Sequence, residues 1–237
     1  MTERYDSIAA AHYAAYRPPL HETILLRVLP AGAQYKVGVD IGCGTGYSAV
    51  ALASYCDRVY AVDPSEAMLG HAIADDRISY RIGEGASIPL PDASADIITF
   101  AGSLFYSDSP DTRSEIVRVG RIGCLVVAYD FDILLRPILA TAGIRLSADA
   151  SAYNHTANLS GAAGLVEQCV ETDEVNLRMS AEQLAHVVLS DSNRCDELAA
   201  HSGTADPWRP LTDALARVGP TLSISARVYY SVYSKGV

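Results

Sequence analysis

The sequence lacks the features by which several classes of protein bind their partners. Its 237 residues carry a net charge of −10 and no basic cluster longer than a couple of residues. We therefore expect neither a nucleic acid nor an anionic membrane surface as the main partner. No stretch approaches the roughly 20 apolar residues of a transmembrane helix. The first residues, MTERYDS, also lack the basic and apolar segments of a secretory signal, so a cytoplasmic location is expected by default.

Metal-binding and disulfide patterns are also missing. The five cysteines are odd in number and none forms a Cys-x-x-Cys pair, which disfavours a disulfide framework and a structural zinc site. No His-Glu-x-x-His arrangement occurs, so zinc hydrolysis has no support. We expect no metal site, and we expect the cysteines to act as small buried hydrophobes.

What is present is a regular alternation of apolar runs and helical patterns. Apolar residues make up 49% of the chain and charged residues 19%, enough to bury a full core. Short runs rich in Val, Ile and Tyr are typical of strands buried on both faces of a parallel sheet. They cover residues 36–41, 58–63, 78–82, 95–100 and 123–129. Helical patterns cover residues 46–55, 65–74 and 111–119 between them.

The alternation predicts a doubly wound α/β fold. Right-handed crossovers then place the carboxyl ends of all parallel strands along one edge. Residues 165–176 and 222–233 read as two further strands, the last of them antiparallel, which makes seven. The first 30 or so residues read as a helix and a turn, and further helices are expected near 132–143, 181–189 and 194–200.

The strongest local signal is the glycine-rich turn Asp40-Ile41-Gly42-Cys43-Gly44-Thr45-Gly46, which follows an apolar strand. Glycines allow positive φ and let a ligand approach the backbone. The spacing is Gly-x-Gly-x-Gly rather than the Gly-x-Gly-x-x-Gly of dinucleotide-binding folds. A carboxylate at Asp40 disfavours a pyrophosphate and suits a ligand with an ammonium or sulfonium group.

Asp63 ends the next apolar run, about 20 residues after the glycine turn. An acidic side chain at this spacing fits a hydrogen bond to a ribose. The alternative is that Asp63 caps the helix expected after Pro64.

Two more loops follow predicted strands. The segment Gly83-Glu84-Gly85 offers a carboxylate and backbone amides that could meet an adenine edge, or it is an ordinary loop. The segment Ala101-Gly102-Ser103 has small residues that leave room for a ligand at the strand ends.

Taken together, these four ordered elements resemble the class I S-adenosylmethionine-dependent methyltransferases. The likeness is to the small-molecule group that includes ubiquinone/menaquinone-type and trans-aconitate-type enzymes. It covers Tyr5-Asp6…Tyr13…Tyr16-Arg17-Pro18 and nearly all of residues 35–130. The resemblance implies a Rossmann-like sheet with a helical lid and methyl transfer from S-adenosylmethionine to a small-molecule acceptor. It further implies one domain over 1–237, comprising a lid segment (1–34), a cofactor-binding core (35–130), an acceptor-side region (131–211) and a C-terminal strand (212–237).

The resemblance also implies roles at matching positions. The methionine part of the cofactor would meet Asp40, Gly42, Gly44, Gly46, Ala101 and Ser103. The ribose would meet Asp63. The adenine would meet Pro64, Met68, Glu84 and Gly85. Arg17 would pair with the cofactor carboxylate and Tyr16 would close over the site. Core packing for Met68 and Tyr16, and a surface position for Arg17, are the alternatives.

Departures from the family pattern leave the reaction partner open. Arg121-Ile122-Gly123-Cys124 stands where the family often has Arg-Pro-Gly-Gly, and Phe105-Tyr106 stands where many relatives carry histidines. The candidate general bases at the strand ends are Tyr106, Tyr129, Asp130 and His155, and none is singled out by the sequence. Oligomeric state is likewise not indicated.

Two rival functions remain. A nicotinamide-dependent oxidoreductase on a similar sheet often carries a Tyr-x-x-x-Lys pair, and none of the 14 tyrosines has Lys four residues on. A non-catalytic cofactor-binding or partner protein of the same fold is the stronger rival, because no catalytic residue is required by the pattern.

Overall fold

The computed structural model describes residues 7–147 and 152–236, which leaves Tyr5 and Asp6 outside the described residues. The chain divides into two compact units. The larger unit comprises Pro19–Phe131, Ala152–Asp173 and Val228–Val237, and the smaller comprises Met1–Pro18, Asp132–Ser151 and Glu174–Arg227. The single domain and its four predicted segments remain predictions, and each unit is described by itself below.

The strands form one seven-stranded sheet, as the sequence predicts. Their order across the sheet is β3 (Ile78–Ile82), β2 (Cys56–Asp63), β1 (Tyr35–Ile41), β4 (Ala95–Ala101), β5 (Gly120–Ile133), β7 (Leu222–Lys235) and β6 (Leu165–Met179). The chain reverses direction across the sheet between β1 and β4, and this reversal is where doubly wound folds bind ligands.

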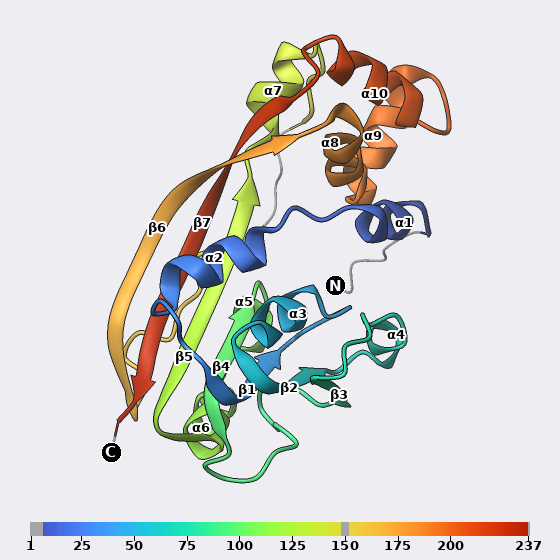
Figure 1. The fold of residues 1–237 in the computed structure, drawn as a ribbon. Helices are drawn as coiled ribbons and strands as arrows, with labels where there is room; N and C mark the ends of the chain where they lie inside the picture. Colours follow the sequence, from blue (N-terminus) through green and yellow to red (C-terminus); the bar gives the residue numbers. More distant parts are fainter. Residues whose placement is uncertain (1–6, 148–151, 237) are drawn as a thin grey trace. The chain divides into compact units, whose positions relative to one another are not determined.

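The first five strands in the chain run parallel. β1 pairs with β2 and β4, β2 pairs with β3, and β4 pairs with β5 (Figure 1). Ile41 lies opposite Val62 on one side and Phe100 on the other. The carboxyl ends of these strands therefore meet at one edge of the sheet.

The last strand runs the other way, as predicted. Leu134 donates its backbone N–H to the carbonyl of Ser225, and the Lys235 ammonium donates to the carbonyl of Gly120. β7 therefore runs antiparallel to β5. The predicted strand at 165–176 is confirmed as β6, which runs three residues further to Met179.

Both faces of the parallel strands are covered, which explains their near-continuous apolar runs. Val39 and Ile41 of β1 join the buried cluster that contains Ile116 and Val119 of α6 (Pro110–Val119). The alternating residues of β1 face α3 (Tyr47–Ala53), which packs in turn against α2 (Leu20–Val28). A Cβ built on Gly38 lies 3.1 Å from Leu52, so a glycine lets α3 approach the sheet closely.

The helix predicted at 181–189 is confirmed as α8 (Ala181–Leu189). The helices predicted at 111–119, 132–143 and 194–200 are confirmed with shifted ends, as α6, α7 (Leu135–Thr141) and α9 (Ser192–Ser202) respectively. The helix expected at 65–74 is wrong in length, because α4 spans only Glu66–Leu69. The chain leaves the helical path there because Ile73 donates its N–H to the carbonyl of Thr45, 3.0 Å away, and so turns back to the glycine turn.

Three helices were not expected from the sequence as separate elements. The first 30 residues hold two helices, α1 (Ser7–Ala15) and α2, because the Pro18-Pro19 pair separates them. The four-residue α5 (Leu104–Ser107) follows β4, and α10 (Trp208–Ala216) precedes the last strand.

The smaller unit is built around α8, which contacts α1, α9 and α10 (Figure 1). A capping box begins this helix, with Ser180 and Gln183 each accepting the other's backbone N–H. The rings of His12, His186 and Trp208 pack together, and the two histidine Nδ1 atoms lie 2.9 Å apart. The predicted lid role of these helices stays a prediction.

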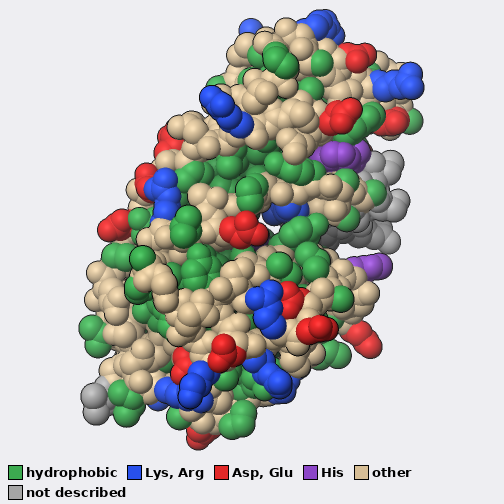
Figure 2. Space-filling view, viewed as in Figure 1, with side chains coloured by type: hydrophobic (Ala, Val, Ile, Leu, Met, Phe, Trp, Pro, Cys, Tyr) green, Lys and Arg blue, Asp and Glu red, His purple; other side chains and the backbone are tan. Residues whose placement is uncertain are grey.

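None of the helices in residues 7–147 and 152–236 has both the length and the apolarity to cross a membrane. The cytoplasmic location stays a prediction. Figure 2 shows acidic and basic side chains interspersed on the viewed face. In the same described residues, no three His, Cys, Asp or Glu side chains are grouped to hold a metal ion.

Candidate functional site

The glycine turn follows β1 directly and depends on glycine at both ends. Gly42 has φ +70°, and a Cβ there would collide with the side chain of Ser103. Gly46 caps α3 with φ +91°, and a Cβ there would collide with the hydroxyl of Tyr80. A Cβ on Gly44 would meet nothing within 4 Å, so the middle of the turn faces open space. Of the three glycines, Gly44 is the one whose Cβ direction is open to a ligand.

Asp63 lies beside this turn at the end of β2. It is 8% exposed, and its Oδ2 accepts the backbone N–H of Gly44 at 2.8 Å. Its Oδ1 accepts the N–H of Ser65, also at 2.8 Å. Ser65, whose hydroxyl accepts from Met68, is the residue that caps α4. The capping alternative for Asp63 is therefore not what the structure shows, and a carboxylate has further lone pairs for a ligand.

Asp40 is wholly buried one residue before the end of β1. Its carboxylate accepts the Ser48 hydroxyl at 2.5 Å and the Thr99 hydroxyl at 2.8 Å. Burial raises the pKa of Asp40 to about 6, against the lowering effect of these two hydrogen bonds. Its predicted contact with the methionine part of the cofactor stays a prediction.

The loop after β3 is held by α6. Glu84 is exposed, whereas Gly85 is buried, and a Cβ on Gly85 would lie 2.9 Å from Thr112. Glu115 accepts the N–H of Ile88 at 2.8 Å. Arg118 donates to the carbonyls of Ile88 and Leu90 and pairs with Glu115. These bonds fix the loop at Ile88 and Leu90, and the Glu84 side chain remains exposed.

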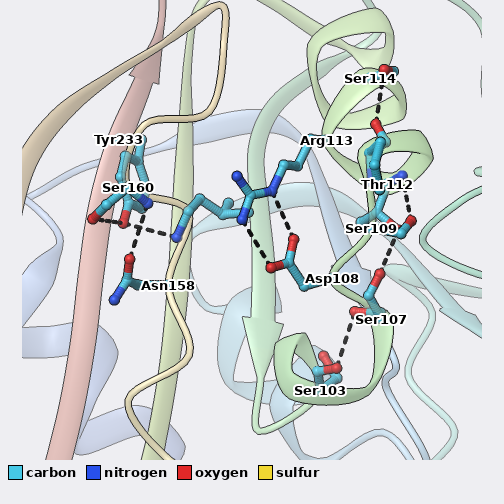
Figure 3. Close-up of polar contacts among 12 residues, drawn as sticks. Ser103, Ser107, Asp108, Ser109, Thr112, Arg113, Ser114, Asn158, Ser160 and Tyr233 are labelled. Atoms are coloured by element: carbon cyan, nitrogen blue, oxygen red, sulfur yellow. Dashed lines mark hydrogen bonds and ion pairs between the residues drawn. The ribbon is translucent and has the colours of Figure 1, made fainter.

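The turn after β4 joins the glycine turn. Ser103 donates its hydroxyl to the carbonyl of Ile41, and Ala101 and Ser103 are half-buried. Figure 3 shows how the following segment is secured: Ser107 donates to the carbonyl of Ser103 at 3.0 Å, and Asp108 and Arg113 form a two-bond ion pair at 2.8 and 2.9 Å. The Ser103 side chain lies against Gly42, where a Cβ would be, so the turn after β4 and the glycine turn are in contact.

Pro64 precedes the capping residue of α4 and is exposed, whereas Met68 lies within α4 and is half-buried. The segment after α4 is fixed by Tyr80, whose hydroxyl donates to the carbonyl of Ile73 at 2.7 Å. Pro64 and Met68 share one edge of the sheet with nine others that lie at the carboxyl ends of strands or just after them: Asp40, Gly42, Gly44, Gly46, Asp63, Glu84, Gly85, Ala101 and Ser103. The structure thus brings eleven of the thirteen predicted residues to that edge.

Tyr16 and Arg17 belong to the smaller unit. The Arg17 guanidinium lies over the Tyr13 ring, 4.0 Å from its centroid, and both Tyr16 and Arg17 are half-buried. Their predicted roles at the cofactor stay predictions.

The four candidate bases differ in their exposure and in their hydrogen-bond partners. Tyr129 is 4% exposed, and burial raises its pKa well above the ordinary value. Tyr106 is 71% exposed. Asp130 and His155 form a pair, with Nδ1 of His155 2.9 Å from Oδ2 of Asp130. The sequence analysis missed Tyr153, which donates its hydroxyl to the same oxygen at 2.7 Å. The one signal in the sequence was its place two residues before His155, in the segment between α7 and β6.

Two cavities lie in different units. One of about 60 Å³ borders His155, Tyr229 and Glu171 in the larger unit, and it has room for a few waters only. The other, of about 610 Å³, lies in the smaller unit between Arg136, Arg194 and Glu197. It belongs to the region in which we expected an acceptor pocket and has the size of a small-molecule site.

Comparison with known proteins agrees with this arrangement. Residues 39–128 match the model of a methyltransferase domain. The chain is 35% identical over 108 residues to a malonyl-[acyl-carrier protein] O-methyltransferase of Yersinia pestis, covering 43% of this chain and 39% of that protein. It is 35% identical over 94 residues to a ubiquinone/menaquinone biosynthesis C-methyltransferase of Rubrivivax gelatinosus, covering 37% and 38%.

Solved structures share the fold over nearly the whole chain. A structure from Anaeromyxobacter dehalogenans, assigned as a type II methyltransferase, has a TM-score of 0.64 at 21% identity and covers 93% of this chain and 98% of that one. The [4+2]-cyclase SpnF has a TM-score of 0.52 at 18% identity, covering 92% and 81%. These likenesses show the fold alone, since a cyclase is among them.

The chain spans about half or less of the length of the curated relatives it matches. The matched segment nevertheless contains the glycine turn, Asp63, the loop after β3 and the turn after β4. Through this segment, the chain is similar to S-adenosylmethionine-dependent methyltransferases.

Proposed function

We propose that this protein is an enzyme that transfers a methyl group from S-adenosylmethionine to a small-molecule acceptor. The observation that carries the proposal is the pairing of the Asp63 carboxylate with the Gly44 amide, 2.8 Å apart, beside a turn whose middle faces open space. A ribose bound there would meet a carboxylate that is already fixed in place and that has lone pairs to accept two hydroxyls.

The residues present fit the cofactor by charge as well as by shape. S-adenosylmethionine carries a sulfonium and an ammonium group, and two carboxylates, Asp40 and Asp63, lie at the ends of neighbouring strands. The Asp40 carboxylate would repel the pyrophosphate of a nicotinamide cofactor, whereas an acid at Asp63 suits the ribose of either cofactor. This argues for the methyltransferase over the oxidoreductase.

We assign the cofactor contacts as the sequence predicts. Gly42, Gly44, Gly46, Ala101 and Ser103 shape the methionine side, and Asp63 holds the ribose. Pro64, Met68, Glu84 and Gly85 surround the adenine. Tyr16 and Arg17 approach from the N-terminal segment. Asp40 acts through its buried charge, because both its oxygens accept hydroxyls from Ser48 and Thr99.

The cofactor supplies an electrophilic methyl group, so the protein has mainly to position the acceptor and exclude water. A general base is needed only where the acceptor loses a proton. Small-molecule methyl transfer is supported by the name of one relative, a ubiquinone/menaquinone biosynthesis C-methyltransferase. No nucleic acid partner is proposed, given the acidic composition.

The competing function is a non-catalytic S-adenosylmethionine-binding or partner protein of the same fold. It stays open because the solved structures show the fold alone, and one of them is a [4+2]-cyclase rather than a methyltransferase. The two functions differ in turnover, not in cofactor binding.

Calorimetric titration tests the cofactor site. We expect S-adenosylmethionine and S-adenosylhomocysteine to bind the purified chain and NAD not to bind. Asp63→Asn should weaken adenosyl binding by roughly 10- to 100-fold, because charged hydrogen bonds contribute about 1.5–3 kcal/mol. Asp57→Asn is the matched control, since Asp57 lies exposed at the opposite end of the same strand. Equal binding by both variants, or preferential NAD binding, would contradict the proposal.

Turnover tests the enzyme. Release of S-adenosylhomocysteine in the presence of a pooled panel of phenols, carboxylates and amines would establish methyl transfer. Adenosyl binding without release from any member would favour the non-catalytic protein.

A further inference from the structure

The pair formed by Asp130 and His155 has the geometry of an oriented base. Asp130 lies near the end of β5, and its Oδ1 accepts the N–H of Phe131 at 2.7 Å. Its Oδ2 accepts the Tyr153 hydroxyl at 2.7 Å and faces Nδ1 of His155 at 2.9 Å. Because an ionised carboxylate only accepts, Nδ1 carries the ring proton and the basic lone pair is on Nε2.

The loop that carries His155 is fixed at several points. The imidazole stacks on Tyr229, with 5.7 Å between ring centroids and an angle of 12°, and it meets the edge of Tyr153 at 4.7 Å. Further along the loop, Leu159 is buried and donates its N–H to the hydroxyl of Tyr233 at 3.0 Å. The ring orientation therefore does not depend on the ion pair alone.

This pair adjoins the turn that contacts the cofactor site. Tyr153 also lies 2.7 Å from the carbonyl of Gly102, and a Cβ on Gly102 would lie 3.3 Å from Asp130. The next residue, Ser103, donates to the carbonyl of Ile41 just before the glycine turn. One short turn thus separates the histidine from the residues assigned to the methionine part of the cofactor.

Aromatic side chains surround the same place. The rings of Phe105 and Tyr106 lie 4.8 and 5.3 Å from that of Tyr153, and these two side chains are 39% and 71% exposed. Large exposed aromatic rings beside a polar pair form a surface on which a planar ring can stack. The cavity of about 60 Å³ behind His155 is too small for such a ligand, so the aromatic side is where it fits.

We propose that His155, positioned by Asp130 and Tyr153, is the general base for methylation of a phenol-type hydroxyl on a planar aromatic acceptor. The inference rests on the proposed methyltransferase function. The acceptor O–H proton passes to Nε2 of His155 as the oxygen forms its bond to the methyl carbon. The carbon–sulfur bond breaks with its electron pair left on sulfur, which yields the aryl methyl ether and S-adenosylhomocysteine, and the proton leaves to solvent. A phenol that titrates near 10 needs such a base at neutral pH.

Two para-substituted phenols of different acidity separate a base from a structural residue. 4-Nitrophenol is largely ionised near neutral pH, whereas 4-methylphenol is not. We expect the wild-type chain to methylate both. His155→Asn should lower the rate with 4-methylphenol by about 10²- to 10⁴-fold and the rate with 4-nitrophenol far less. A loss of equal size for both phenols would overturn the proposal, as would a wild-type chain that binds S-adenosylhomocysteine but methylates neither.

Two controls distinguish failure of the general-base proposal from failure of the proposed methyltransferase function. His71→Asn changes an exposed histidine outside the assigned residues and should leave both rates unchanged. Calorimetric binding of S-adenosylhomocysteine should be the same in wild type, His155→Asn and Asp130→Ala. If the wild type itself does not bind S-adenosylhomocysteine, it is the methyltransferase function that fails.

A spectroscopic measurement tests the pair without turnover. Long-range ¹H–¹⁵N correlation spectra of His155 should show the Nδ1–H tautomer in the wild type and both tautomers in Asp130→Ala. Tyr153→Phe should keep the Nδ1–H tautomer, because the carboxylate is still present. An Nε2–H tautomer in the wild type would overturn the assignment of Nε2 as the base.

Discussion

Replacing Asp40 with asparagine should make the free energy of unfolding less dependent on pH. The Asp40 carboxyl is wholly buried between β1, β4 and α3, where two hydroxyls donate to it. Burial raises its pKa from 3.8 to about 6, because the charged form loses its solvation. Asparagine has nearly the same shape and can hydrogen-bond with the same hydroxyls, but it carries no charge.

The direction and size follow from proton linkage. A carboxyl whose pKa is raised by folding contributes its full stabilisation below pH 3.8 and loses it as pH rises to about 6. The interval between these two values corresponds to about 3 kcal/mol at 1.36 kcal/mol per pH unit. Asp40→Asn should therefore gain up to about 3 kcal/mol over the wild type between pH 4 and pH 7, with no further gain above that.

Urea unfolding of both proteins at a series of pH values measures this difference. Other titrating groups cancel when the two curves are subtracted. A difference that stays constant from pH 4 to pH 7, or that favours the wild type more at pH 7, would refute the burial argument. Because the charge at Asp40 is assigned to the cofactor site, the same variant should bind S-adenosylmethionine more weakly, so stability and binding change in opposite directions.

Three further substitutions test how the site is held. Gly46→Ala should lower the free energy of unfolding by more than 2 kcal/mol in a urea melt, whereas Gly203→Ala, strained but facing open space, should cost about 1 kcal/mol; equal losses would contradict the predicted clash. Arg118→Ala should cost about 1–2 kcal/mol and weaken S-adenosylhomocysteine binding several-fold by calorimetry, because Arg118 pins the loop after β3; unchanged binding would place that loop away from the ligand. Ser180→Ala should lower stability by about 1 kcal/mol without changing that binding, since it removes only the α8 capping box.

The alternation of strands and helices along the chain, and the turns that follow the parallel strands, could be predicted because their signals are local. A strand buried on both faces reads as a continuous apolar run, and a turn that needs positive φ reads as glycine. The glycine turn and the acid after β2 therefore appear at the predicted places. Parallel pairing then brings their loops to one edge without further information.

Contacts between distant segments could not be predicted in the same way. The sequence pattern predicts a helix over all of residues 65–74. In the structure α4 ends earlier, and the Ile73 N–H donates to the carbonyl of Thr45 instead of within a helix. Similarly, Asp130 and His155 are named by the sequence only as separate candidates. Their pairing depends on how the loop after residue 151 returns to β5, and the carboxylate of Asp130 is shared with Tyr153, which has no motif of its own.

The hydrogen bonds of Asp40 could not be predicted from the sequence pattern either. Its position before the glycine turn predicted that its carboxylate contacts a ligand. In the structure, its two oxygens accept the hydroxyls of Ser48 and Thr99. Thr99 pairs with Asp40 across neighbouring strands, and Ser48 belongs to the helix that follows. Only the packing of α3 on the sheet brings these hydroxyls to the acid.

A crystal structure of the chain with S-adenosylhomocysteine tests the central claim most directly. We expect the ligand at the carboxyl ends of β1 and β2, with both ribose hydroxyls on the Asp63 carboxylate and the homocysteine portion over Gly44. Density for the ligand elsewhere, or a ribose without contact to Asp63, would contradict it.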